Sequence, residues 1–273
     1  MTDRYAVIGN PISHSKSPAI HAAFAAATGQ DMRYDAMLGP LDGFAATVRA
    51  FRDSGGCGMN VTIPFKLQAL ELADETSERA RGAGAVNALK FEGGRILADN
   101  ADGLGLISDI RRNLGVAFKG KRVLVCGAGG AARGAMLPLL AEAPATLVVA
   151  NRTVAKAEAL ATIFGAIGPV QACGYADLGD AWFDIVINTT SATLSGERLP
   201  LNDSVFRADG LAYEMMYGKG LTPFLGQARA AGTARIADGL GMLIEQAAEA
   251  FEWWRGVRPD TSVLITSMAQ PLI

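Results

Sequence analysis

The stretch Arg122-Val-Leu-Val-Cys-Gly-Ala-Gly-Gly-Ala-Ala132 predicts the centre of the fold. Its first five residues form a short, mostly apolar run that is typical of a buried strand, and a helical pattern follows from Ala131 to Leu140. The loop between them has the form G-x-G-x-x-A of the dinucleotide fingerprint. In that fingerprint Gly127 makes the tight turn, Gly129 lets the backbone approach a pyrophosphate, and Ala132 packs the helix on the strand. A tight turn without a ligand is the alternative interpretation.

The residues after the next strand indicate which dinucleotide fits this loop. The strand from Thr146 to Ala150 ends where NAD enzymes carry an Asp or Glu on the ribose hydroxyls. Here Asn151-Arg-Thr153 follows, with Lys156 beyond it and no acid in between. Two cations, a hydroxyl and an amide suit a 2′-phosphate, so we predict NADP rather than NAD. The alternative for Arg152 and Lys156 is a solvated helix start.

Strands and helices alternate along the rest of the chain, which indicates an α/β fold with open sheets and helices on both faces. Residues 86–91 and 95–97, separated by Glu92-Gly-Gly94, predict a hairpin at a sheet edge. The other expected strands are 5–8, 32–38, 57–63, 184–188, 211–213 and 234–236. The other expected helices are 18–27, 43–52, 65–72, 75–81, 104–114, 222–231, 239–254 and 261–268.

A length of 273 residues suits two domains. The turn-rich stretch Asp99-Asn-Ala-Asp-Gly103 marks the first boundary, because a different kind of loop follows the next strand. We expect an N-terminal open α/β substrate-binding domain over residues 1–103 and a C-terminal Rossmann-type NADP-binding domain over residues 104–240. The helices within 241–273 are expected to pack back on the first domain.

The composition narrows the class of protein. Half of the residues are apolar, 19% are charged and the mean hydropathy is +0.21, as in a compact enzyme. A net charge of −2 gives no reason to expect nucleic acid or an anionic membrane as a partner. The most apolar region, 123–150, contains Arg133 and Glu142 and is too interrupted for a membrane span. The opening apolar run, 5–8, is too short for a signal peptide.

The cysteines and histidines argue against disulfides and metals. Cys57, Cys126 and Cys173 are odd in number and far apart, which suggests free buried thiols and a cytoplasmic location. His14 and His21 are the chain's two histidines, so we expect no metal site.

The segment Asn60-Val-Thr-Ile-Pro-Phe-Lys66 places a lysine directly behind a strand end. Pro64 stops the strand and an amphipathic segment begins at Phe65, so Lys66 is expected in the first turn of a helix. The unpaired N–H groups there carry partial positive charge, which disfavours an ammonium group and suits the side chain to proton transfer. An ordinary surface lysine is the alternative.

Ser17 and Gln246 are further candidates. Ser17-Pro18 predicts a helix start, because serine is favoured at the cap and proline at the first helical position. Gln246 lies within the apolar stripe of the helix at 239–254 and therefore needs polar partners, either backbone groups or a ligand.

Taken together, these residues make the chain similar to shikimate dehydrogenases over essentially its full length. The resemblance implies reversible reduction of 3-dehydroshikimate to shikimate with NADPH, in aromatic amino acid biosynthesis. One motif alone is weak evidence, but the joint order and spacing are specific. The matched motifs are Asn10-Pro-Ile-Ser-His-Ser-Lys-Ser-Pro18, Asn60 to Lys66, Gly84-Ala-Val-Asn87, Asp99 to Gly103, the glycine loop, Asn151 to Thr153, Tyr217-Gly-Lys-Gly220 and Asp238-Gly-Leu-Gly-Met242.

The resemblance also implies roles for matched residues. Ser15 and Ser17 would hold the substrate carboxylate, which agrees with hydroxyls at a helix N-terminus forming an anion site. Lys66 would give a proton to the ketone oxygen as the hydride arrives, and Asp102 would orient the lysine. The other substrate contacts would be Thr62, Asn87, Tyr217 and Gln246. The cofactor contacts would be Gly127, Ala128, Gly129, Gly130, Ala131, Asn151, Arg152, Thr153, Lys156, Met215, Gly239 and Glu78.

Three positions depart from the family's pattern. Ala101 stands where threonine is common, Glu214 stands where aspartate is expected, and the segment Thr189 to Ser195 lacks a glycine near the nicotinamide. A quinate/shikimate paralogue stays an alternative, although relatives that accept quinate often have threonine in place of Ser17. A non-catalytic NADP-binding regulatory protein is the other alternative. The chain is expected to be a monomer or a homodimer that binds a small-molecule substrate.

Overall fold

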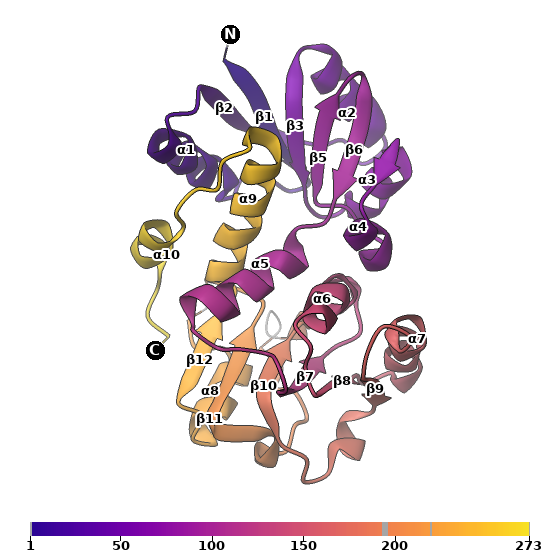
Figure 1. Ribbon diagram of the computed structural model, residues 1–273, viewed down its shortest axis with the longest axis vertical. Coiled ribbons are helices and arrows are strands. Elements are labelled where there is room, and N and C mark those ends of the chain that lie inside the picture. The colour runs from indigo at the N-terminus through magenta and orange to yellow at the C-terminus, as the bar shows by residue number, and fades with distance from the viewer. Residues whose placement is uncertain (1, 193–195, 219, 273) are drawn as a thin grey trace. The chain divides into compact units, whose positions relative to one another are not determined.

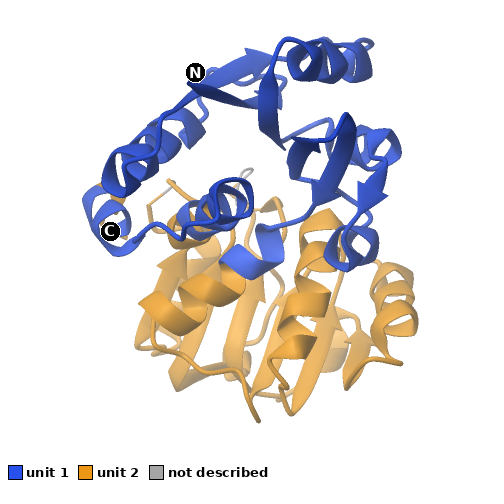
Figure 2. Cartoon of the chain, turned by 45° about the horizontal axis from the view of Figure 1, so that its top comes forward, with its two compact units in different colours: residues 1–105, 244–267 blue, residues 106–243, 268–273 orange. Residues whose placement is uncertain are grey.

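The computed structural model describes residues 2–192, 196–218 and 220–272 (Figure 1). The chain divides into two compact units, which Figure 2 shows in different colours. Unit 1 comprises Met1–Gly105 and Ile244–Ser267, and unit 2 comprises Leu106–Leu243 and Met268–Ile273. The divisions fall within three residues of the predicted ones, but residues 268–273 group with unit 2.

Unit 1 is built on one sheet, whose described strands run in the order β2-β1-β3-β5-β6-β4. Parallel pairs join β1 to β2 and β3, whereas β5 is antiparallel to both β3 and β6. The strands are β1 (Asp3–Gly9), β2 (Met32–Leu38), β3 (Gly56–Val61), β4 (Glu75–Thr76), β5 (Ala88–Glu92) and β6 (Arg95–Asp99). The helices are α1 (Ser17–Thr28), α2 (Phe44–Asp53), α3 (Lys66–Leu72), α4 (Glu78–Ala83) and α10 (Ser262–Met268).

The predicted hairpin is confirmed as β5 and β6, but its predicted place at the edge is wrong. Residues 75–76, which the sequence predicted as helix, form β4 and pair in parallel with the outer side of β6. The helix in this region therefore begins at Glu78, after Ser77, whose hydroxyl accepts a hydrogen bond from Ala80 N.

Both faces of the unit 1 sheet are covered, which explains why β1 reads as a continuous apolar run. Ala6 and Ile8 point to the face packed by α2 and α3, and the alternate residues Tyr5 and Val7 point to the other. On that other face α9 (Leu240–Arg255) lies beside β1 (Figure 1). The indole of Trp254 on α9 donates to Leu89 O at 3.0 Å, which anchors the helix to the sheet.

Unit 2 contains a fully parallel sheet with the order β12-β11-β10-β7-β8-β9 among its described strands. Read from β9, this is the Rossmann order 3-2-1-4-5-6, in which a dinucleotide lies where the order reverses, between β7 and β10. The strands are β7 (Arg122–Cys126), β8 (Thr146–Ala150), β9 (Val170–Cys173), β10 (Phe183–Asn188), β11 (Phe206–Glu214) and β12 (Arg235–Asp238). The sequence predicted no strand at β9.

Helices pack on both faces of this sheet as well. Apolar residues of α6 (Gly130–Ala141) and α7 (Val154–Phe164) pack with Val123 and Val125, whereas α8 (Pro223–Ala230) packs on the side of Leu124 and Cys126. The remaining helical segments within the described residues are α5 (Asp102–Ser108), which leads into unit 2 from unit 1, and the short segments η1 (Asp109–Asn113), η2 (Tyr175–Leu178) and η4 (Asp203–Val205). The α/β class and the Rossmann-type second sheet are confirmed.

The three cysteines are free, as predicted. Their expected burial holds for Cys126 alone, because Cys57 and Cys173 are partly exposed. Among the described residues, no helix combines the length and apolar character needed to cross a membrane.

Candidate active site

Lys66 lies in the first turn of α3, as the sequence predicted, and the helix begins at Lys66 rather than at Phe65. The turn before it is closed by a hydrogen bond from Phe65 N to Thr62 O at 2.9 Å. Phe65 is buried and stacks on Phe44 with the ring centroids 4.8 Å apart, so the residue next to Lys66 is anchored in the core. The ammonium group is thereby presented from a fixed backbone position beside the end of β3.

The partner of Lys66 is Asp102, which begins α5. Lys66 Nζ donates to Asp102 Oδ2 at 2.5 Å, and Asn87 Nδ2 donates to the other oxygen, Oδ1, at 2.8 Å. The same amide nitrogen lies 3.2 Å from Gln246 Oε1 on α9. The side chains of Lys66 and Asp102 keep 30% and 23% of their surface exposed, so a small molecule can reach the pair.

Unit 1 thus brings together four of the predicted substrate residues, Lys66, Asn87, Asp102 and Gln246. They come from α3, the segment before β5, α5 and α9, which are far apart in the sequence. Gln246 Oε1 on the apolar stripe of α9 accepts from the side chain of Asn87, a partner that the sequence did not predict.

Ser15 and Ser17 lie together at the start of α1, but the predicted cap at Ser17 is wrong. Lys16 occupies the cap position without a side-chain cap, and Ser17 is the first helical residue. The hydroxyl of Ser15 accepts from Ser17 N at 3.3 Å instead. Ser15 makes this contact because its hydroxyl reaches the first N–H group of the helix from two residues upstream.

Two buried residues that the sequence did not single out connect the start of α1 to Asn87. Tyr34 on β2 donates its hydroxyl to Asn60 Oδ1 at 2.7 Å, and Asn60 Nδ2 donates to Asn87 O at 3.2 Å. Burial raises the pKa of Tyr34 well above its usual value, an effect that a hydrogen bond with Ser17 partly opposes. Polar residues on buried strands are the signal by which the sequence could have revealed them.

Thr62 lies in the turn between β3 and α3 and is held by its backbone, which donates to Ile8 O at 3.0 Å. A Cβ at Gly9 would lie 2.5 Å from Thr62 Cγ2, so the side chain of Thr62 fills the space beside Gly9. Glycine at position 9 therefore leaves room for Thr62 beside the strand.

In unit 2 the glycine loop has the backbone that the fingerprint requires. Gly127 has φ of +107°, and a Cβ there would lie 2.7 Å from Thr189 Oγ1 and 2.8 Å from Thr190 Cγ2. Gly129 caps α6 and, like Gly130, has open space where a side chain would be. With Ala128 and Ala131, these residues leave the N-terminus of the twelve-residue helix α6 accessible to a phosphate.

The residues predicted to bind the 2′-phosphate lie after β8. Asn151 Nδ2 donates to Thr153 O at 2.9 Å, and Thr153 occupies the cap position of α7 without a side-chain cap. Arg152 and Lys156 are both exposed, and neither forms an ion pair with another residue that the structure describes. Their charges are thus available to a ligand at the carboxyl end of the parallel sheet.

Met215 and Gly239 lie together at the ends of β11 and β12. A Cβ at Gly239 would lie 2.1 Å from Met215 O, so only glycine permits this approach. Tyr217 is half-buried in unit 2, and Glu78 is exposed on α4 of unit 1. Tyr217 thus belongs to unit 2, whereas the other predicted substrate residues belong to unit 1. Glu78 belongs to unit 1, whereas the other predicted cofactor residues belong to unit 2.

Glu214, noted from sequence as a departure, is a fully buried carboxylate at the end of β11. It accepts from Asn188 Nδ2 at 2.8 Å, Met216 N at 3.2 Å and Thr222 Oγ1 at 3.4 Å. Asn188 Oδ1 in turn accepts from Thr190 N at 3.0 Å. This network connects the loop after β10 to the loop after β11. The segment Thr189 to Ser195, which lacks the glycine expected from the family's pattern, is described only in part, because residues 193–195 lie outside the described residues.

Comparisons with known proteins agree along the whole chain. The profile of the shikimate dehydrogenase substrate binding domain matches residues 7–89, that of shikimate / quinate 5-dehydrogenase matches residues 109–197, and that of the shikimate 5′-dehydrogenase C-terminal domain matches residues 239–267. A relative from Nitrosospira multiformis named shikimate dehydrogenase (NADP(+)) is 56% identical over 272 residues, which cover 100% of this chain and 99% of the relative.

Solved structures share the fold of the chain along nearly its whole length. An Ael1 enzyme from Pseudomonas putida superimposes with a TM-score of 0.97 at 56% identity, covering 99% of this chain and 100% of that one. A shikimate 5-dehydrogenase from Thermus thermophilus, solved in complex with NADP(H) and shikimate, has a TM-score of 0.84 at 32% identity, covering 95% of this chain and 96% of that one.

Proposed function

Since this chain belongs to the shikimate dehydrogenase family, we propose that Lys66 and Asp102 are the catalytic pair of its reaction. The chain is an NADP-dependent oxidoreductase that acts on a CH–OH group. It reduces 3-dehydroshikimate to shikimate reversibly with NADPH, in aromatic amino acid biosynthesis.

The contact between Lys66 Nζ and Asp102 Oδ2 is the observation that carries the proposal. When bound, NADPH supplies a hydride to the carbonyl carbon. Lys66 donates its proton to the carbonyl oxygen, which becomes a hydroxyl group, and the neutral amine regains a proton from solvent. Asp102 holds the ammonium group in place, and Asn87 fixes the carboxylate through its second oxygen.

The substrate carboxylate is assigned to Ser15 and Ser17, whose positions at the start of α1 provide hydroxyl groups near free helical N–H groups. The ring hydroxyls of the substrate are assigned to Thr62, Asn87 and Asp102, and Tyr217 and Gln246 are assigned to the part of the pocket near the carboxylate. Residues 1–103 with the helices of 241–273 are accordingly proposed as the substrate-binding domain.

The cofactor is assigned to residues 104–240, with Glu78 as one contact from outside this range. The backbone of Gly127 and the accessible N-terminus of α6 fit a pyrophosphate, because no side chain fills the space beside Gly129 and Gly130. The 2′-phosphate is assigned to Arg152 and Lys156 with Asn151 and Thr153. Met215, Gly239 and Glu78 complete the proposed contacts.

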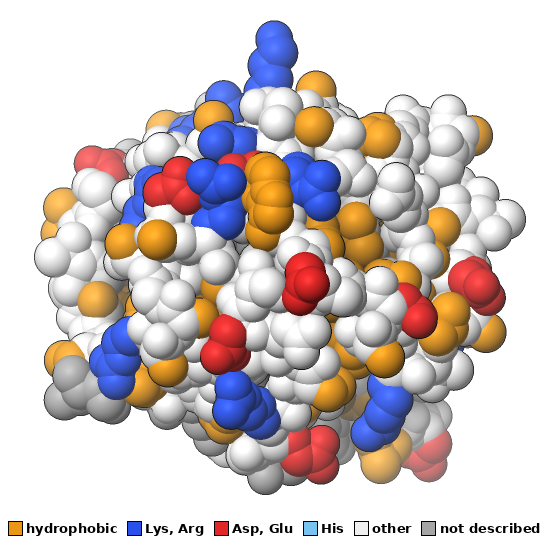
Figure 3. Space-filling view, turned by 90° about the horizontal axis from the view of Figure 1, so that it is seen from below, with side chains coloured by type: hydrophobic (Ala, Val, Ile, Leu, Met, Phe, Trp, Pro, Cys, Tyr) orange, Lys and Arg blue, Asp and Glu red, His pale blue; other side chains and the backbone are white. Residues whose placement is uncertain are grey.

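The partners and location are proposed on separate grounds. On the face of the molecule in Figure 3, acidic and hydrophobic side chains lie among the lysines and arginines, which supports a small-molecule substrate rather than nucleic acid. The free thiols support a cytoplasmic location. The chain is proposed to act as a monomer or homodimer.

Replacing Lys66 with alanine tests the catalytic assignment. We expect kcat to fall by about 10³-fold or more while KM changes little, because a proton donor acts mainly in the transition state. The rate of NADPH formation from shikimate and NADP measures both constants. A large rise in KM with an unchanged kcat would show that Lys66 only binds substrate.

The quinate/shikimate paralogue is tested in the same assay. We expect kcat/KM to be higher for shikimate than for quinate, and the opposite order would favour that alternative. A protein that binds NADP but turns over neither substrate would be the non-catalytic alternative.

A further inference from the structure

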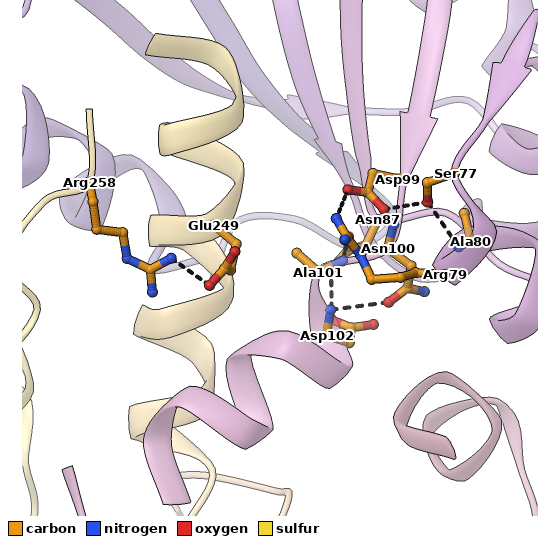
Figure 4. Close-up of polar contacts among 10 residues, drawn as sticks. All are labelled: Ser77, Arg79, Ala80, Asn87, Asp99, Asn100, Ala101, Asp102, Glu249 and Arg258. Carbon is orange, nitrogen blue, oxygen red and sulfur yellow. Dashed lines mark hydrogen bonds and ion pairs between the residues drawn. The ribbon is translucent and has the colours of Figure 1, made fainter. Parts of the chain in front are cut away.

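The loop that leads into Asp102 is held in an unusual way. Three consecutive backbone N–H groups, those of Asn100, Ala101 and Asp102, each donate to a side-chain oxygen. The acceptors are Asp99 Oδ1 at 2.7 Å, Asn87 Oδ1 at 2.8 Å and Asn100 Oδ1 at 3.0 Å, respectively. Figure 4 shows these residues between the end of β6 and the start of α5. The conformation of this loop therefore depends on side chains.

Asn100 is fixed from both ends of its amide. Its Oδ1 accepts from Asp102 N, and its Nδ2 donates to Ala85 O at 3.0 Å. The residue is 4% exposed, so water contributes little to either bond. The amide of Asn100 thus links the first residue of α5 to the segment between α4 and β5.

Asp99 is fixed through both carboxylate oxygens. Its Oδ1 accepts from Ser77 Oγ at 2.5 Å as well as from Asn100 N, and its Oδ2 accepts from Arg79 Nη2. The residue is 7% exposed. Ser77 caps α4 and Arg79 lies in its first turn, so the start of the loop is attached to this helix.

We propose that Asp99 and Asn100 are positioning residues that hold Asp102 at the distance and angle at which it contacts Lys66. The proposal rests on the proposed catalytic roles of Lys66 and Asp102. The carboxylate of Asp99 fixes the orientation of the Asn100 N–H group, and the amide of Asn100 fixes that of the Asp102 N–H group. Arg79 holds the carboxylate of Asp99 in place. Neither Asp99 nor Asn100 touches the reacting groups, so each acts through Asp102.

The chemical consequence follows from the geometry of the pair. Asp102 receives Lys66 on one oxygen and Asn87 on the other, so a shift of its backbone breaks both contacts at once. A displacement of about 1 Å at a reacting group can lower a rate about 10²-fold. The Ala101 side chain cannot form a hydrogen bond, so the side chains of Asp99 and Asn100 hold the loop.

The test compares Asn100→Ala with Asn100→Ser. Alanine removes the acceptor for Asp102 N, whereas a serine hydroxyl can accept from the N–H two residues further along the chain. We expect Asn100→Ala to lower kcat by about 10- to 100-fold with KM within about twofold of wild type, and Asn100→Ser to recover most of that loss.

A matched control removes a similar bond at the other end of β6. Asp74 Oδ2 accepts from Ile96 N at 2.7 Å, and Asp74 has no contact with the loop. Asp74→Ala should lower the melting temperature and leave kcat unchanged. If Asn100→Ala does not fold, Asp99→Asn replaces it, because this change removes the carboxylate charge that Arg79 contacts and leaves one oxygen in place of two as acceptor. A fall in kcat of about threefold or more is expected for it.

The second measurement repeats the substitution in Lys66→Ala. If Asn100 acts through the pair, Asn100→Ala should lower the residual kcat of Lys66→Ala by less than about twofold, since coupled residues are not additive. An equal loss in both backgrounds, or full kcat in Asn100→Ala, would overturn the positioning role alone. Full kcat in Lys66→Ala would overturn the catalytic assignment and the positioning role with it.

Discussion

Replacing Arg152 with alanine should weaken NADP binding and leave NAD binding nearly unchanged. Arg152 follows β8, the strand after the glycine loop, which ends at the ribose position of a bound dinucleotide. Its side chain is exposed and forms no ion pair with another residue in the described part of the chain. The guanidinium group is therefore free to pair with a 2′-phosphate, which NAD lacks.

The expected size of the effect follows from the exposure of Arg152. Losing a hydrogen bond to a charged group costs about 1.5–3 kcal/mol, and solvent screening of an exposed pair lowers this to about 1–2 kcal/mol. The dissociation constant for NADPH should therefore rise about 5- to 30-fold. Lys156 keeps part of the attraction, because an ammonium group on a flexible stem still reaches the phosphate.

Calorimetric titration of NADPH and NADH into both proteins measures the effect. Arg235→Ala is a suitable control, because Arg235 is an exposed arginine of the same unit at the amino end of β12, where it donates to Asp209 O. Its removal should leave both dissociation constants unchanged. The NADPH affinity of Arg152→Ala should also depend less on salt than that of wild type.

Equal weakening of NADPH and NADH binding by Arg152→Ala would refute the 2′-phosphate assignment. Such a result would mean that Arg152 contacts a part common to both cofactors. A change of less than about twofold for NADPH would refute it as well, because a lost charge pair exceeds that size. The melting temperature of each variant shows whether the fold is retained.

Two further predictions concern stability. His21 is fully buried and stacks on Tyr34 with the ring centroids 4.1 Å apart, and burial lowers the pKa of its imidazole to about 3. Below pH ~6.5 the imidazole of the unfolded chain binds a proton, whereas that of the folded chain stays neutral down to pH ~3. As the pH is lowered from ~6.5 to ~3, the free energy of unfolding should therefore fall by about 1.4 kcal/mol per pH unit. Urea unfolding of His21→Phe should lack this contribution, and an unchanged slope would contradict the assignment. A Cβ at Gly241 would lie 2.0 Å from Asp109 Oδ1, which belongs to the carboxylate that accepts the Tyr213 hydroxyl. Gly241→Ala should therefore destabilise the protein by about 1–3 kcal/mol in thermal unfolding, and an unchanged melting temperature would be evidence against this packing.

The features that the sequence predicted correctly are local in the chain. The turn at Gly127 follows from the spacing of glycines and alanine behind an apolar run, and the structure has the positive φ that this spacing requires. Lys66 was placed at the start of a helix because Pro64 ends the strand before it. Each of these inferences uses only the backbone preferences of a few consecutive residues.

The features that the sequence missed depend on partners far along the chain. The strand β9 is short and weakly patterned, and it exists because β8 offers it an edge. The same reason explains β4, which pairs with β6 where a helix was predicted. Pairing with an existing strand overrode local propensity at both places.

The sequence by itself determined the α/β class, the dinucleotide loop, the preference for NADP and the identity of the residues in the matched motifs. Only the tertiary structure decided which side chains meet, such as Asn87 with Asp102 and Gln246, or Asp99 with Arg79. The physical reason is that backbone preferences act over a few residues. A hydrogen bond between side chains depends on where the whole sheet places the ends of its strands.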